Sequence, residues 1–149
     1  MGTLILPVNG AVYVDANVLI YRVEAVQPHL AISMPLWDAL RHGIQTVVTS
    51  ELSLLEVLVK PLQLGDLRLQ NLFRVILYNT RGFSCVPIDQ QMLEIAAQLR
   101  ATTSLKTPDA IHAATALATS CTLFVTNDLA FRRVPGLNVA VLSEIAAAP

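Results

Sequence analysis

Four acidic residues of this sequence lie at positions from which their carboxylates could act together. Asp15 directly follows the apolar run Val12–Val14, and Asp128 follows a second apolar run that ends at Thr126. In open parallel sheets, ligands bind beyond the carboxyl ends of the strands, where the strand order reverses. If these two strands are neighbours in one sheet, the two carboxylates converge.

Glu56 and Asp109 lie on predicted helices and add two further carboxylates. In the segment TSELSLLEVLVK, apolar residues cover most of the helix, whereas Ser53, Glu56 and Lys60 share one narrow polar stripe. That stripe is predicted to line a wet cleft. In the segment KTPDAIHAATAL, Thr107 is expected to cap a helix whose first turn contains Asp109.

Clustered carboxylates favour a bound cation. They repel one another, and burial raises their pKa values and neutralises some of them. A divalent cation reverses this penalty, and oxygen ligands without a nearby Cys or His pair favour Mg²⁺ or Mn²⁺ over zinc. We therefore predict that Asp15 helps to hold a metal ion.

Each acid also has a purely structural explanation. Asp15 is suited to cap the helix that follows it, and Asp128 belongs to an Asn-Asp pair typical of turns. Asp109 would be favoured by the helix dipole, and Glu56 is placed to pair with Lys60 at i,i+4 spacing in solvent. The metal-site hypothesis depends on the four residues as a set.

Three other residues with reactive side chains are expected to be structural. His112 lies one turn after Asp109, and a lone histidine there is interpreted as a packed or solvated side chain rather than a ligand. Cys85 and Cys121 lie in apolar, strand-like runs and are predicted to be small core residues without a disulfide. Free thiols suit a reducing cytoplasm.

The composition predicts one hydrophobic domain with a partner. Apolar residue types make up 54% of the 149 residues and charged types only 14%, which is apolar for a soluble domain. No segment has the roughly 20 apolar residues of a membrane-spanning helix, and the first ten residues do not resemble a signal peptide. The apolar excess predicts a surface covered by a partner or a second copy, so we expect a homodimer. A net charge of −1 gives no overall basic field for nucleic acid.

Apolar runs alternate with helical patterns along the whole chain, as in α/β domains with a parallel sheet. Most of the runs are apolar throughout, which is typical of a sheet covered on both faces. One domain over residues 1–149 is expected. Strands are predicted at residues 11–14, 46–49, 83–87, 122–126 and 137–142. Helices are predicted from near residue 16 and at residues 28–42, 50–59, 66–79, 89–102 and 108–119.

These segments together resemble the PIN-domain family, especially the VapC-type toxins of bacterial toxin–antitoxin pairs. The matching stretches are VDANVLIY around Asp15, TSELSLLEVL around Glu56, KTPDAIHAATAL around Asp109 and VTNDLAFRRVPGLNVAVL around Asp128. They occur in the order of the family and span nearly the whole chain. The resemblance implies a single PIN-like α/β domain whose central parallel sheet has strand order 3-2-1-4-5 and helices on both faces.

The resemblance also implies a function, because members of this family are metal-dependent ribonucleases. Asp15, Glu56, Asp109 and Asp128 fall on the acidic positions of the family and would be its catalytic residues and metal ligands. Asn17 and Thr126 match its supporting polar positions. One or two Mg²⁺ or Mn²⁺ ions, an RNA substrate and a cognate antitoxin protein that covers the site are implied in the same way.

The sequence departs from the family in two respects. The leader before the first strand is longer than in many toxins, and basic residues near the site are few. Only Lys106, Arg132 and Arg133 are candidate RNA contacts. A PIN-like module that binds RNA or protein without cleavage is the alternative, although none of the four carboxylates is missing.

Two phosphoryl-transfer folds with acids at strand ends are disfavoured. Haloacid-dehalogenase-like phosphatases need a second Asp two residues after the first, where this chain has Asn17. Response-regulator receivers need a Lys after the last strand, and Lys60 and Lys106 are the only lysines. Both folds are therefore weak alternatives.

Overall fold

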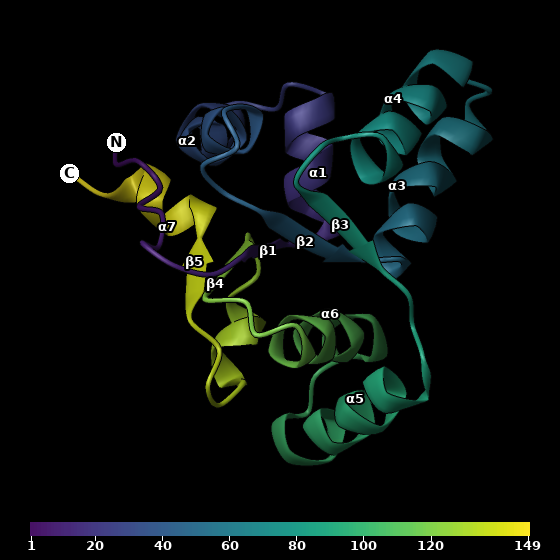
Figure 1. The fold of residues 1–149 in the computed structure, drawn as a ribbon, viewed down its shortest axis with the longest axis vertical. Coiled ribbons are helices and arrows are strands. Elements are labelled where there is room, and N and C mark those ends of the chain that lie inside the picture. The colour runs from purple at the N-terminus through teal and green to yellow at the C-terminus, as the bar shows by residue number, and fades with distance from the viewer.

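The centre of the protein is a five-stranded parallel sheet, described by a computed structural model of residues Met1–Pro149. The strand order is β3-β2-β1-β4-β5, as predicted, and every neighbouring pair is parallel (Figure 1). Val14 of β1 lies opposite Val125 of β4, so the segments after these strands leave the same edge of the sheet. The strands are β1 (Val12–Val14), β2 (Val47–Ser50), β3 (Phe83–Val86), β4 (Leu123–Thr126) and β5 (Val139–Val141).

Helices cover both faces of this sheet. Helices α1 to α4 lie on one face and α5 and α6 on the other, while α7 lies beside the end of β5 (Figure 1). The helices are α1 (Ala16–Val23), α2 (His29–Arg41), α3 (Leu52–Gln63), α4 (Leu67–Tyr78), α5 (Gln90–Thr103), α6 (Thr107–Ala118) and α7 (Leu142–Ala147), and a short 3₁₀ helix, η1 (Leu129–Arg133), follows β4. None of the helices has both the length and the apolar character that crossing a bilayer requires.

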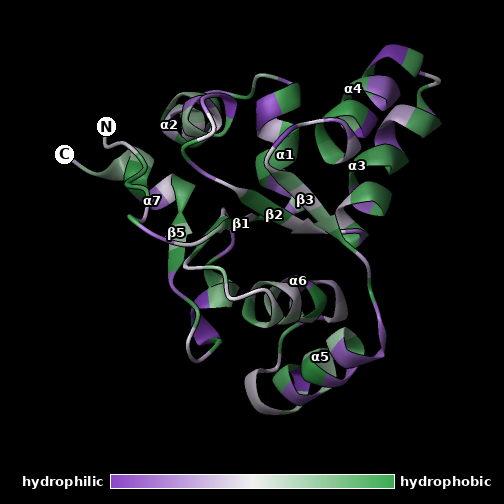
Figure 2. Cartoon of the chain, viewed as in Figure 1, coloured by the Kyte–Doolittle hydropathy of each residue, from purple (hydrophilic) through white to green (hydrophobic).

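Two hydrophobic cores lie on opposite faces of the sheet because successive strand residues point to opposite sides. Val12 and Val14 of β1 pack in the core beneath α1 to α4, whereas Tyr13 packs in the core beneath α6. Phe124 of β4 joins Tyr13, and its flanking residues join the other core. Burial on both faces explains the almost continuously apolar strands (Figure 2).

Some local predictions differ from the structure at the ends of elements. The helix predicted at residues 50–59 begins later, at Leu52, because Ser50 ends β2, although the Ser50 hydroxyl accepts a hydrogen bond from the Leu52 amide at 3.1 Å. Thr107 is the first residue of α6 and not its cap. The strand predicted at residues 137–142 is shorter, because the chain turns into α7 at Leu142. Cys85 and Cys121 are free, as expected, and are half-buried at the edges of the two cores.

The eleven residues before β1 are held to the domain by backbone hydrogen bonds and by one buried side chain, Leu4. The Gly2 amide donates to the Ile145 carbonyl of α7 at 3.0 Å, and the Leu4 amide donates to the Ile32 carbonyl of α2 at 3.3 Å. Leu4 is buried in the core of α1 to α4. This leader therefore joins α2 to α7 and brings the two termini close together (Figure 1).

A tight turn at Gly10 delivers the leader into β1. Gly10 has a φ of +84°, and its carbonyl accepts a hydrogen bond from the Gln45 side chain at 2.7 Å. The Thr122 hydroxyl donates to the neighbouring Asn9 carbonyl at 2.6 Å. A Cβ atom at Gly10 would lie 2.3 Å from Cγ2 of Thr122, so no other residue fits without a shift.

We predict that Gly10→Ala lowers the free energy of unfolding by about 2–4 kcal/mol, the combined effect of a left-handed backbone and overpacking. Gly43→Ala is the matched control, because Gly43 has a φ of +71° but open space around its Cβ position. Gly43→Ala is expected to lower the free energy of unfolding by only about 1 kcal/mol. Urea denaturation of both variants measures the difference. Equal losses would show that contact with Thr122 contributes nothing.

Candidate active site

A cavity of about 170 Å³ opens at the carboxyl edge of the sheet, where β1 and β4 end. Four separate segments contribute acids to its wall, and they are the four acids singled out in the sequence. The lining residues are Asp15, Ala16, Asn17, Ile20, Glu56, Asp109, His112, Asp128 and Phe131. The cavity is therefore predominantly acidic, on a protein of nearly zero net charge.

Asp15 is buried and has both structural and site contacts. One carboxylate oxygen caps α1 by accepting from the Val18 amide at 3.2 Å, and the other accepts from the Thr126 hydroxyl at 2.5 Å. Burial raises the pKa of Asp15, and the hydrogen bond from Thr126 partly opposes that rise. The capping alternative is thus correct, but it does not remove this carboxylate from the cavity.

Asp109 and Asp128 reach the cavity from α6 and from the segment after β4. Asp109 lies in the first turn of α6, and burial, followed by the charge of Asp128, raises its pKa. One oxygen of Asp128 accepts from the Ala130 amide at 2.8 Å and caps η1. The Asp128 amide donates to the Thr126 hydroxyl at 3.0 Å, so Thr126 is bonded to both Asp15 and Asp128.

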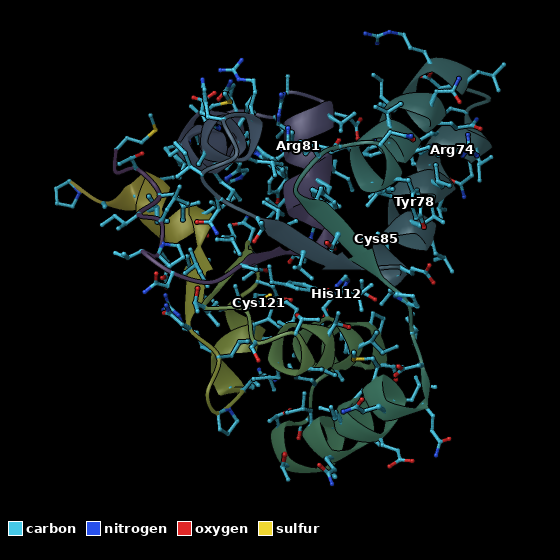
Figure 3. All side chains as sticks on the ribbon, in the orientation of Figure 1. Arg74, Tyr78, Arg81, Cys85, His112 and Cys121 are labelled. Carbon is cyan, nitrogen blue, oxygen red and sulfur yellow. The ribbon has the colours of Figure 1, made fainter.

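Glu56 lines the cavity, as predicted, and does not form the alternative surface pair with Lys60. Its Oε1 lies 2.5 Å from Nε2 of His112 on α6, and the Nδ1 of that histidine lies 2.6 Å from the Tyr13 hydroxyl. His112 is packed between the sheet and α6 (Figure 3), as expected, yet its partner was not foreseen. The spacing of Asp109 and His112 by three residues places both on one helix face, and could have predicted a shared cavity.

The predicted supporting and basic residues differ in their position relative to the cavity. Asn17 lines the cavity, but the three basic candidates do not. Arg132 forms an ion pair with Glu144 of α7, in which Nη1 lies 2.8 Å from Oε1. Lys106 immediately precedes α6 and partly opposes the rise in the pKa of Asp109. Arg133 is exposed at the end of η1 and forms no ion pair.

The side chains around the cavity offer oxygen donors, the ligand type that Mg²⁺ and Mn²⁺ prefer. As they stand, no three His, Cys, Asp or Glu side chains are grouped closely enough to hold one ion. Mutual repulsion separates carboxylates that have no counter-charge between them. The donor set fits a hard cation in its chemistry, and binding would need the acids to move closer together.

Comparisons with known proteins agree with this fold. A family model described as PIN domain matches residues 12–137, and no curated protein matches the sequence. VapBC2 from Rickettsia felis, bound to a promoter DNA fragment, is similar in structure, with a TM-score of 0.67 and 15% identity over 88% of this chain and 98% of that one.

Two further solved structures have similar scores. A toxin–antitoxin complex from Klebsiella pneumoniae has a TM-score of 0.64 and 23% identity over 89% of this chain and 97% of that one. VapC20 from Mycobacterium tuberculosis, described as a sarcin-ricin loop cleaving toxin, has a TM-score of 0.67 and 15% identity over 82% and 93%. These structures share the fold. Because the family model covers most of the sequence, from β1 to the segment before β5, the chain belongs to the PIN-domain family.

Proposed function

We propose that this protein is a ribonuclease that hydrolyses RNA phosphodiester bonds with one or two bound Mg²⁺ or Mn²⁺ ions. One observation carries the proposal: carboxylates from four separate segments line a single cavity at the carboxyl edge of the sheet. The family to which the chain belongs supports it, since the resemblance of its motifs to VapC-type toxins implies the same chemistry. The activity is expected in the cytoplasm.

In the proposed mechanism, Asp15 and Asp128 form the floor of the site, and Glu56 and Asp109 close its sides. The hydroxyl of Thr126 fixes one oxygen of Asp15 at 2.5 Å, so that this carboxylate keeps one orientation. A bound cation would lower the pKa of a water molecule and stabilise charge on the leaving oxygen. A carboxylate that does not bind the cation would accept the proton of the attacking water.

RNA must be attracted against the charge of the cavity. Unneutralised carboxylates repel phosphate, so the cation and nearby basic side chains supply the attraction. Lys106 and Arg133 are the proposed phosphate contacts, because neither forms an ion pair. Arg132 is a third candidate, although its contact with Glu144 would have to be exchanged for one with RNA.

We also propose that the protein is the toxin of a type II toxin–antitoxin pair, inhibited by a cognate antitoxin. Similar structures support this proposal, since those from Rickettsia felis and Klebsiella pneumoniae are complexes of a toxin with its antitoxin. An acidic cavity suits an inhibitor that presents a basic side chain. Co-purification with the product of the adjacent gene would be the direct observation.

A non-catalytic PIN-like module that binds RNA or protein is the second candidate. The absence of a ready-made group of three metal ligands favours it. Such a module would bind RNA without cleaving it, with or without a divalent cation. The presence of all four acids favours the nuclease.

We predict that Asp15→Asn lowers Mg²⁺-dependent RNA cleavage by at least about 100-fold, because a charged metal ligand is lost. The fold is retained, because the amide oxygen can still accept from the Val18 amide while the amide N–H donates to the Thr126 hydroxyl in place of the bond that Asp15 accepts from it. Asp66→Asn is the matched control. Asp66 also caps a helix, accepting from the Leu69 amide at 2.9 Å, but it lies outside the cavity. The rate of cleavage of a labelled RNA, with and without EDTA, measures the effect. Wild-type activity in Asp15→Asn would rule out the proposed metal site.

The same substitution is expected to stabilise the metal-free protein at neutral pH. Because the pKa of Asp15 is raised in the folded state, its ionisation costs stability as the pH rises through that value. Asp15→Asn removes this cost, and each 1 kcal/mol gained in this way would raise the melting temperature by about 2–4 °C. Thermal unfolding in EDTA should show a gain at pH 7 that shrinks as the pH approaches the unfolded value of 3.8. A lower melting temperature for the variant at pH 7 contradicts this account.

The proposed homodimer has a candidate surface on α3. Leu55, Val59 and Leu62 follow one face of this helix at i,i+4 and i+7 spacing and are 63%, 45% and 55% exposed. Leu64 and Leu67, in and after the turn to α4, extend the same apolar surface and are also exposed. A surface of this kind is unfavourable in water, and contact with a second copy would cover it.

We predict that the double substitution Val59→Glu and Leu62→Glu makes the protein monomeric, because carboxylates cannot be buried unpaired in an apolar interface. Val8→Glu is the control, since Val8 is an exposed apolar residue in the leader, away from α3. Light scattering at micromolar concentration gives the mass of each variant. A monomeric wild-type protein, or a dimeric double variant, would argue against this interface.

A further inference from the structure

We infer that His112 is a positioning residue for Glu56, and that Tyr13 holds His112 in the form that can do so. The inference deepens the proposed function, on which it rests, by assigning a role to two residues outside the four acids. It starts from a continuous chain of hydrogen bonds, from the Ser50 amide through Tyr13 and His112 to the carboxylate of Glu56.

The hydrogen bonds of Tyr13 determine which nitrogen of His112 carries the proton. The Tyr13 oxygen accepts from the Ser50 amide at 3.1 Å, and that amide can only donate. The neighbouring Thr49 hydroxyl is engaged with the Val14 carbonyl and with Ser53. The phenol proton therefore points at Nδ1 of His112, 2.6 Å away, which makes Nδ1 an acceptor.

A neutral imidazole with an acceptor at Nδ1 carries its proton on Nε2. That N–H group points at Oε1 of Glu56, 2.5 Å away. Tyr13 thus selects the tautomer that donates to the carboxylate. No other hydrogen bond reaches the Glu56 carboxylate, so His112 occupies Oε1 and leaves Oε2 for a cation.

Packing keeps His112 in this orientation. Tyr13 is 0% exposed and His112 only 2% exposed. The Tyr13 ring stacks on Phe124 with 4.8 Å between ring centroids and meets the His112 ring edge-on at 5.8 Å. Alanines 110, 113, 114 and 116 of α6 are buried beside the sheet, so the helix that carries His112 lies close to it.

Glu56 needs such a partner because no helix cap and no backbone donor fixes its carboxylate. It lies in the middle of α3 and, unlike Asp15 and Asp128, caps no helix. Its side chain remains 32% exposed. A carboxylate fixed before a cation arrives loses less conformational freedom on binding, so the hydrogen bond from His112 should raise the affinity of the site.

The alternative is that His112 merely joins α3 to α6. A structural contact and a positioning contact both predict lower stability after substitution, so stability alone does not separate them. Metal affinity does, because only a positioning residue acts on the cation through Glu56. A side chain that restores an N–H donor at the position of Nε2 should then restore the affinity.

The test is Mn²⁺ binding to the full chain, measured by titration calorimetry without RNA. His112→Leu removes the donor and is expected to weaken Mn²⁺ binding about 10- to 100-fold. His112→Gln places an amide N–H near the position of Nε2 and is expected to stay within about threefold of the wild type. Gln70→Leu is the control, since Gln70 is equally buried but lies on α4, outside the cavity.

RNA cleavage supplies an independent readout. If His112 acts through the cation, the kcat of His112→Leu recovers at saturating Mn²⁺, whereas a damaged fold does not recover. Unchanged Mn²⁺ affinity in His112→Leu overturns the inference, and so does equal weakening in His112→Gln. If His112→Leu does not fold, Tyr13→Phe is tested in its place. This variant is expected to show a smaller loss of Mn²⁺ affinity, and an unchanged affinity overturns the inference. A wild-type protein that neither binds Mn²⁺ nor cleaves RNA overturns the proposed function itself.

Discussion

Negative charge gathered at the end of a hydrophobic sheet is the constraint that governs this structure. Four carboxylates line one cavity, and burial raises the pKa values of Asp15 and Asp109. Charges in such a place persist only where hydrogen bonds compensate for lost hydration. Three of the acids have a specific donor: the Thr126 hydroxyl for Asp15, the Ala130 amide for Asp128 and the His112 imidazole for Glu56.

The sheet supplies these donors through its topology. Because β1 and β4 are adjacent and parallel, the last residue of β4, Thr126, lies beside Asp15 and bonds to it. The alternation of β1 directs Tyr13 into the opposite core, where it reaches His112 beneath α6. A three-residue strand thus delivers one acid to the cavity and supports a second acid through a buried histidine. Displacing β1 would disturb both.

Features that depend on residues close together in the sequence were predicted well, and features that depend on distant residues were not. Strand cores and most helices follow from local patterns, since doubly buried strands are apolar throughout and helices show a 3.6-residue period. The sheet order came from the family resemblance, because pairing between distant strands leaves no local signal. Residues 137–142 were ambiguous for a related reason: a short apolar run does not reveal where β5 ends and α7 begins.

Side-chain partners were the least predictable features. A pair between Glu56 and Lys60 was considered because both residues lie on α3. The partner of Glu56 is instead His112, 56 residues away in the sequence. Arg132 was assigned to RNA from its charge, and Glu144 of α7, a helix that was not predicted, forms an ion pair with it. Such pairs depend on how helices pack across the sheet, which a single sequence does not contain.

The same electrostatics connect the proposed catalysis with the proposed inhibition. A cavity that carries uncompensated carboxylates is stabilised by whatever brings positive charge to it, whether a divalent cation or a basic side chain of an antitoxin. Both ligands would use the same acids, so occupation by one opposes occupation by the other. Glu56 would be the point of greatest sensitivity, because His112 already satisfies one of its oxygens and only Oε2 is available to either ligand. An arginine binds a carboxylate best through both of its oxygens, whereas a compact ion can bind a single one. The contact between His112 and Glu56 therefore favours the ion over an arginine.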